Sequence, residues 1–125
     1  MTVTAQYTVA ITPGEPLLEG TGRFGFEKTW TGGLEGTSSG LMLTGGDPAS
    51  GSAGYVALEV FTGTLDGRRG SVTFQQSGAM DGGEPDLLYL IVPGSGTEDL
   101  AGVRGSVTVE GIDDDGVHEV SVALD

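Results

Sequence analysis

Four polar side chains that could take part in catalysis or binding stand at otherwise apolar positions of the sequence: Lys28, Glu59, Gln76 and His118. Each lies in a segment where apolar and polar residues alternate, as in a β-strand with one buried face. All four are in step with the apolar residues of their segments, so we expect all four to point inward. A single buried charge is costly, and Lys28 and Glu59 should therefore be paired or hydrated.

These residue types allow either binding or catalysis. Lys28 or Gln76 could stabilise a developing oxyanion, and Glu59 or His118 could act as a general acid or base. Structural explanations stay open for each of them. Lys28 and Glu59 could form an ion pair that fills the interior, Gln76 could be a satisfied core amide, and His118 could lie at a solvated rim.

Aromatic side chains fall on the same inward set of positions. A small-molecule site combines apolar walls with a few convergent polar groups, and these positions would supply the walls. The same side chains could instead form an ordinary core. The aromatic residues expected to line a ligand site are Tyr7, Phe24, Phe26, Trp30, Tyr55, Phe61, Phe74 and Tyr89.

Period-two alternation dominates the whole chain, and no segment carries helix caps with a 3.6-residue period. The eight predicted strands span residues 2–12, 23–31, 34–44, 54–64, 69–80, 86–92, 104–112 and 117–124. Short turns join most of them, which favours an all-β fold: a closed antiparallel up-and-down barrel of about eight strands with a central cavity. A β-sandwich is the alternative. Two longer links, 13–22 and 44–54, are expected to cover or rim an opening.

One short pattern occurs twice, as WTGGLEG at 30–36 and FTGTLDG at 61–67. Each copy falls where one predicted strand ends and the next begins. Glycine permits the sharp bend, and we expect the leucine to anchor the turn against the core. A weaker variant covers residues 96–105, so the pattern predicts a recurrent barrel corner.

Composition narrows the classes of function. The 125 residues fit one domain, 1–125, and the formal net charge of −13 opposes nucleic-acid binding and attraction to anionic membranes. The sequence has no cysteine and one histidine, which argues against a zinc site, and no motif calls for a cofactor. GIDDDGVHE at 111–119 reads as a hairpin turn, not a calcium loop. Without a signal peptide or an apolar run of spanning length, we expect a cytoplasmic protein that does not enter a membrane.

Two predicted strands, 54–64 and 86–92, are apolar on both faces. Their second faces would leave an apolar patch outside the barrel, and such patches usually mark an interface. The simplest partner is a second copy of the chain, so we expect a homodimer formed through the barrel wall.

Several stretches carry a family resemblance: KTWTGGLEGTSSG (28–40), GSAGYVALEVFTGTLDGRRGSVTFQQSGAMDGG (51–83), VPGSGTEDLAGVRG (92–105) and DGVH (115–118). They resemble a small bacterial family of unknown function with an allene oxide cyclase-like β-barrel. The corner at 94–105 also looks like that of dirigent proteins, which share the barrel. The resemblance implies a cavity-bearing, often oligomeric barrel that works without a cofactor. Relatives commonly carry histidine where this chain has Gln76, so the lumen here is expected to be more apolar.

Three functions fit these expectations. The first is a barrel that binds a small, largely apolar or amphipathic molecule in its lumen. The second is a cofactor-free isomerase or cyclase that holds a flexible substrate near its reactive conformation in the same lumen. The third is a scaffold that works through its outer apolar strands.

Overall fold

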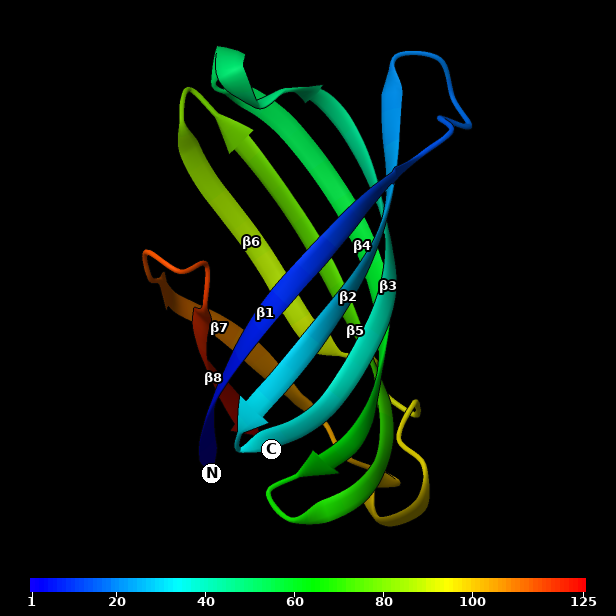
Figure 1. The fold of residues 1–125 in the computed structure, drawn as a ribbon, viewed down its shortest axis with the longest axis vertical. Coiled ribbons are helices and arrows are strands. Elements are labelled where there is room, and N and C mark those ends of the chain that lie inside the picture. The colour runs from blue at the N-terminus through cyan, green and yellow to red at the C-terminus, as the bar shows by residue number, and fades with distance from the viewer.

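Eight strands follow one another around a closed antiparallel barrel, and the order in space is the order in the chain, β1 to β8 (Figure 1). The computed structural model describes every residue, Met1–Asp125. The strands are β1 (Thr2–Gly14), β2 (Thr21–Gly32), β3 (Leu34–Asp47), β4 (Ser52–Leu65), β5 (Arg68–Asp81), β6 (Glu84–Ile91), β7 (Gly105–Ile112) and β8 (His118–Leu124). Two short 3-10 turns, η1 (Pro48–Ser50) and η2 (Glu98–Leu100), complete the secondary structure.

Closure of the ring depends on β8, which pairs with β1 from Thr2–Ala123 to Tyr7–His118. This pairing confirms the predicted all-β, up-and-down barrel and excludes the sandwich. All eight predicted strands are present, and their ends extend or shrink by only a few residues because the glycine-rich segments beside them continue the ladders. The segment predicted as a link at 44–54 is mostly strand, and only η1 turns the chain there.

The barrel has two unlike halves because β7 and β8 are short. Strands β3 to β6 extend well beyond them in Figure 1. The ladder between β6 and β7 contains a single register pair, Leu90–Ser106. At one end all eight strands surround the lumen, and we call this end the closed half. The other end, where the long strands curve without β7 and β8 to complete the ring, is the open half.

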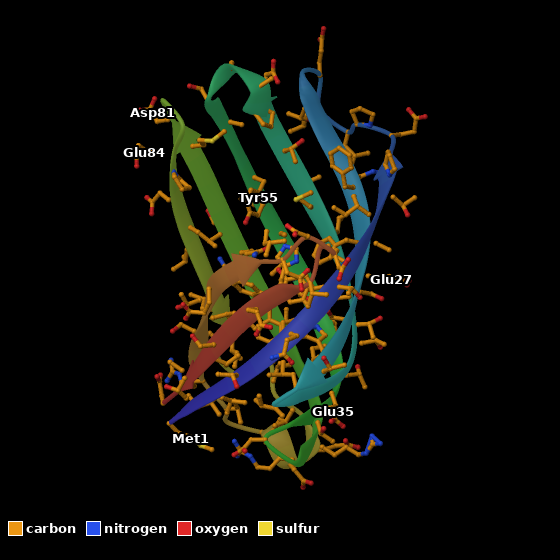
Figure 2. All side chains as sticks on the ribbon, turned by 60° about the vertical axis from the view of Figure 1, so that its left-hand side comes forward. Met1, Glu27, Glu35, Tyr55, Asp81 and Glu84 are labelled. Carbon is orange, nitrogen blue, oxygen red and sulfur yellow. The ribbon has the colours of Figure 1, made fainter.

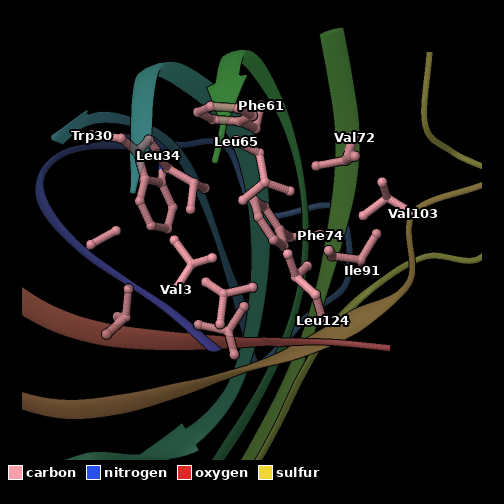
Figure 3. Packing of buried hydrophobic residues seen from close by; sticks show 14 of the residues in the cluster. Val3, Trp30, Leu34, Phe61, Leu65, Val72, Phe74, Ile91, Val103 and Leu124 are labelled. Carbon is pink, nitrogen blue, oxygen red and sulfur yellow. The ribbon is translucent and has the colours of Figure 1, made fainter. Parts of the chain in front are cut away.

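A packed hydrophobic core fills the closed half (Figure 3). Trp30, Phe61 and Phe74 are its largest fully buried side chains, and their rings contact one another edge-on or stacked. The segment between β6 and β7 plugs the end of the barrel with Leu100 and Val103. Burying apolar area of this kind is the main source of stability for a domain of this size.

The repeated pattern has the predicted structural role. Leu34 and Leu65, one from each copy, are completely buried and face each other across β3 and β4. Gly36 and Gly63 are also directly paired, and both have φ values near +150°. A side chain at Gly36 would meet the carbonyl oxygen of Thr62 at 2.2 Å, so only glycine allows the two backbones to approach there.

The outer face of β3, β4 and β6 carries the predicted apolar patch. Six of its side chains are between 38% and 56% exposed: Leu41, Leu43, Val56, Leu58, Val60 and Leu88. We call this set the outer apolar face. The link between β1 and β2 adds to it, since Leu17 and Leu18 line a hollow with Leu43 and Val56 on the outside of the barrel. The link therefore lies at the open end without lining the cavity inside.

None of the helical segments has the length and apolar character needed to cross a membrane.

Candidate functional site

A buried ion pair lies at the boundary between the two halves. The Lys28 ammonium of β2 donates a hydrogen bond to Oε1 of Glu59 on β4 at 2.7 Å, and the two residues are only 4% and 2% exposed. Strand β3 lies between them in the sheet, where Lys28 pairs with Ser38 and Glu59 pairs with Gly40. Of the two sequence-based alternatives, paired or hydrated charges, the structure has the pair.

Three further side chains extend the ion pair into a network. Tyr89 of β6 donates its hydroxyl to Glu59 Oε1 at 3.1 Å and accepts from Lys28 Nζ at 3.0 Å. Ser38 donates to the other carboxylate oxygen at 2.5 Å and accepts from the Trp30 indole nitrogen at 3.0 Å. No buried side-chain nitrogen or oxygen lacks a partner. A fully satisfied network of this kind fixes the rotamers of its members and rigidifies the centre of the barrel.

Aromatic rings surround the Lys28 ammonium. Its nitrogen lies 4.2 Å from the ring centre of Tyr7, 5.1 Å from that of Tyr89, 5.3 Å from that of Phe26 and 5.6 Å from that of Trp30. The electron-rich faces of such rings attract a cation, most strongly where water is excluded. The cage therefore lowers the cost of burying this charge, together with Glu59.

Burial dominates the protonation chemistry of the network. It lowers the pKa of Lys28 below 10.5, and the neighbouring Glu59 carboxylate opposes this effect. Burial and the Glu59 charge together raise the pKa values of Tyr89 and Tyr7, so both phenols stay protonated at neutral pH. The phenol of Tyr55 contributes to both shifts, as a smaller cause than burial and Glu59.

His118 lies at the start of β8, next to this cluster. Its ring stacks on Tyr7 with the centroids 4.5 Å apart and the planes 11° from parallel. Burial lowers the pKa of His118, opposed by the contact with the Gly116 carbonyl and reinforced by Lys28. The 3.2 Å contact of Nδ1 with that carbonyl places the ring proton on Nδ1, so Nε2 is an acceptor. The side chain is only half-buried, as expected for a residue at a rim.

A cavity of about 450 Å³ occupies the inner face of the open half. Its walls come from five strands, β2 to β6, together with η1. The side chains that line it are mostly apolar, and they include Phe24, Met42, Tyr55, Met80 and Leu87. This volume lies within the range of pockets that hold small organic molecules. The predicted link at 44–54 lines this opening with Thr44, Pro48 and Ala53, as expected for a rim segment.

Two inward-facing glycines make room for aromatic rings. A side chain at Gly40 would meet the Phe26 ring at 2.2 Å, and one at Gly78 would meet the Tyr55 ring at 2.5 Å. Each ring therefore occupies the space that a side chain at the glycine would take, a pairing also used to stabilise glycine within sheets. Of these residues, Gly78 and Tyr55 line the cavity.

The predicted site residues fall into three groups. Lys28, Glu59, Tyr7, Tyr89, Phe26 and Trp30 meet in the buried network and its cage, with His118 stacked beside them. Phe24 and Tyr55 line the cavity of the open half. Phe61 and Phe74 belong to the core of the closed half and are 0% and 1% exposed, so they do not face the cavity.

Gln76 lies between the cavity and the network. On β5 it is paired with Ala57 and Tyr89, and it occupies the inward position between buried Phe74 and the cavity-lining Gly78. The side chain is half-buried and makes no hydrogen bond within the protein. It is therefore not the satisfied core amide that was one of its two sequence-based explanations.

Ser38 is a member of the network that sequence reasoning missed. It is 2% exposed and joins Trp30 to Glu59. A signal was available, because Ser38 is in step with Leu34, an anchoring leucine of the repeat. It was weak, because the inward positions on either side of Ser38 are Gly36 and Gly40, which hide the alternation. Met42, Met80 and Leu87 of the cavity were likewise not assigned to the site, although the inward strand positions contain them.

No cluster of three or more histidine, aspartate or glutamate side chains could hold a metal ion.

Fold and site together define a closed eight-stranded β-barrel whose lumen is filled at one end and hollow at the other. Residues 3–124 match the family described as "Protein of unknown function (DUF3224)", and the chain belongs to this family. It is similar to a crystal structure of a protein of unknown function from the same family, from Shewanella oneidensis MR-1. The two are 35% identical with a TM-score of 0.91, over 100% of this chain and 96% of that one. No curated protein matches the chain. The likeness to allene oxide cyclase and dirigent barrels stays a prediction.

Proposed function

We propose that this barrel binds a small, largely apolar molecule in the cavity of its open half. The observation that carries the proposal is the cavity itself, about 450 Å³ of apolar space above a fully satisfied, rigid floor. Apolar walls drive binding by the area they remove from water, and a preformed site avoids the cost of ordering loops.

The position of the polar groups supports the same proposal. Gln76 and Tyr55 are only half-buried, and their side chains make no hydrogen bond within the protein. They come from two different strands, β5 and β4; Tyr55 lines the cavity, and Gln76 occupies an inward position two residues from the cavity-lining Gly78. A ligand that enters with its polar end first would satisfy them, while its apolar body would contact Phe24 and Met42.

Filling the cavity should abolish binding without damage to the core. Ala53 lines the open half and is partly exposed, so Ala53→Trp is expected to fill the space and weaken binding of the neutral dye Nile red by about tenfold or more. The dye's fluorescence enhancement measures its affinity. Ala10→Trp, at an exposed outward position of β1, is the matched control and should leave the affinity unchanged.

The same assay distinguishes binding of Nile red in the cavity from binding of the dye to the outer apolar face. A Leu58→Glu variant places a charge in the middle of that face. If this variant loses the dye and Ala53→Trp retains it, the proposed site is wrong.

A second candidate function is cofactor-free isomerisation or cyclisation in the same lumen. The observation that favours it is the Glu59–Lys28–Tyr89 network, in which acid, base and hydrogen-bond donor lie within 3.1 Å of one another next to the cavity. Such groups can move a proton or stabilise an oxyanion. Recovery of the bound molecule in rearranged form distinguishes this function from simple binding.

We also infer that the outer apolar face pairs with a second copy of the chain. The central stretches of β3 to β6 that carry this face contain one charged residue, Glu59, and it points inward. In a chain of net charge −13, two copies can therefore meet there without bringing like charges together. A two-fold pairing would cover the same leucines and valines on both copies.

Leu58→Glu is expected to convert such a dimer to a monomer, because each copy would then bury a charge at the centre of the contact. Light scattering coupled to size-exclusion chromatography measures the mass. Thr62→Glu, on the same strand and outward-facing but outside the apolar set, is the control and should stay dimeric. A wild-type protein that is monomeric at high micromolar concentration would overturn the inference.

A further inference from the structure

The buried interior of the barrel carries no net charge. Lys28 and Glu59 are its only buried charged side chains, and they neutralise each other at 2.7 Å. Two of the three ammonium donors of Lys28 bind Glu59 and Tyr89, and the ring of Tyr7 lies over the same group at 4.2 Å. The lysine is therefore fully engaged and offers no counter-ion to an anionic ligand.

Apart from the acidic Asp86 at the cavity's edge, the other titratable groups that face the lumen are three phenols and one imidazole, all neutral near pH 7. Burial raises the pKa values of Tyr7, Tyr55 and Tyr89, and it lowers that of His118. A phenol, an amide and a neutral imidazole are good partners for a neutral polar group. None of them compensates a charge taken out of water.

The rim of the open end opposes anions as well. Its segments, residues 13–25, 44–54 and 80–87, contain six acidic residues and one basic residue, Arg23. Figure 2 shows two of the acids, Asp81 and Glu84, at this end of the barrel, above Tyr55. Acidic groups around a low-dielectric opening raise the electrostatic cost for a negatively charged molecule to enter. These acids therefore disfavour the entry of an anion into the cavity below them.

From these observations we infer that the open half selects an uncharged amphipathic molecule, with a hydroxyl, carbonyl or amide group directed at Gln76 and Tyr55, and rejects carboxylates. This inference rests on the proposed function and specifies its ligand class. It follows from the geometry of the neutralised Lys28–Glu59 pair, the unpartnered neutral groups above it and the acidic rim.

A matched pair of probes tests it. 2-Naphthalenemethanol and 2-naphthoate share one apolar skeleton and differ in charge, and titration calorimetry at pH 7.5 measures both affinities. We expect the alcohol to bind at least about tenfold more tightly than the carboxylate. Equal or tighter binding of the carboxylate overturns the inference and leaves the proposed function standing. Binding of neither probe overturns both.

Two variants and one control sharpen the result. Glu59→Gln removes the counter-ion of Lys28, so it should raise the affinity for 2-naphthoate by about tenfold. Glu35→Gln removes the same charge at the opposite end of the barrel and should change neither affinity (Figure 2). Gln76→Leu, at a half-buried position outside the network, should lower the affinity for the alcohol and leave the affinity for the carboxylate unchanged. An unchanged selectivity in both Glu59→Gln and Gln76→Leu would contradict the inference.

Discussion

Replacing Glu59 with alanine is expected to destabilise the fold by about 3–5 kcal/mol, because it leaves the Lys28 ammonium buried without a counter-ion. The change also removes the acceptor of the Ser38 and Tyr89 hydroxyl groups. Urea unfolding at pH 7 measures the loss as a lower midpoint with an unchanged slope. A loss below about 1 kcal/mol would show that the lysine reaches water or gives up its charge at little cost.

The double variant Lys28→Met/Glu59→Leu is the control for that experiment. It removes both charges and nearly keeps the volume, so it should be more stable than Glu59→Ala, with a remaining cost from the Ser38 and Tyr89 hydroxyls that lose their acceptor. The pH dependence gives a second check. In Glu59→Ala, burial holds the folded-state pKa of Lys28 below its ordinary value of 10.5. At pH values between these two pKa values, the unfolded chain binds more protons than the folded one. The stability of the single variant should therefore rise as the pH approaches 10.5.

Phe74→Ala is expected to lower the free energy of unfolding by about 3–5 kcal/mol, the range observed when a large aromatic side chain is removed from a packed core. Phe74 is 1% exposed, and its ring centre lies 5.6 Å from that of Tyr89 and 5.8 Å from that of Trp30. Urea unfolding again gives the size of the effect. Because Trp30 is the only tryptophan, its fluorescence emission should shift to longer wavelength as the variant's core admits water.

Phe24→Ala is the matched control. Phe24 lines the open cavity and is half-buried, so its loss should cost about 1 kcal/mol or less while weakening binding of a ligand in the lumen. Equal costs for the two phenylalanines would contradict the division of the barrel into a packed half and a hollow half.

Alternation along the strands predicts which side of the sheet each residue faces, and this is why the inward set was correct. Phe26, Lys28 and Trp30 share a face in any register. Whether Lys28 meets Glu59 depends on two successive registers, Lys28–Ser38 and Gly40–Glu59, and these are set by the turns on either side of β3. The cost of burying a charge required only that each be paired or hydrated, so the sequence left open whether Lys28 and Glu59 meet.

Depth along the barrel was not predictable from the sequence. Phe61 and Phe24 both face inward, yet one lies in the core and the other lines the cavity. The difference arises because β7 and β8 stop short, so only the closed half is surrounded on all sides. Strand periodicity carries no information on such tertiary lengths. Ser38 was missed for a local reason, since glycine on both neighbouring inward positions removes the apolar signal.

The single residue pair between β6 and β7 has a consequence for how the chain folds. Strands β1 to β6 form through hairpins between neighbours, which need only short loops to close. Completing the ring instead requires residues near the two ends of the chain to meet, as at Thr2 and Ala123, and that step carries the largest loss of chain entropy. The β7–β8 hairpin is therefore expected to dock last and to detach first. Its amides should exchange with solvent deuterium sooner than those of β3 to β5.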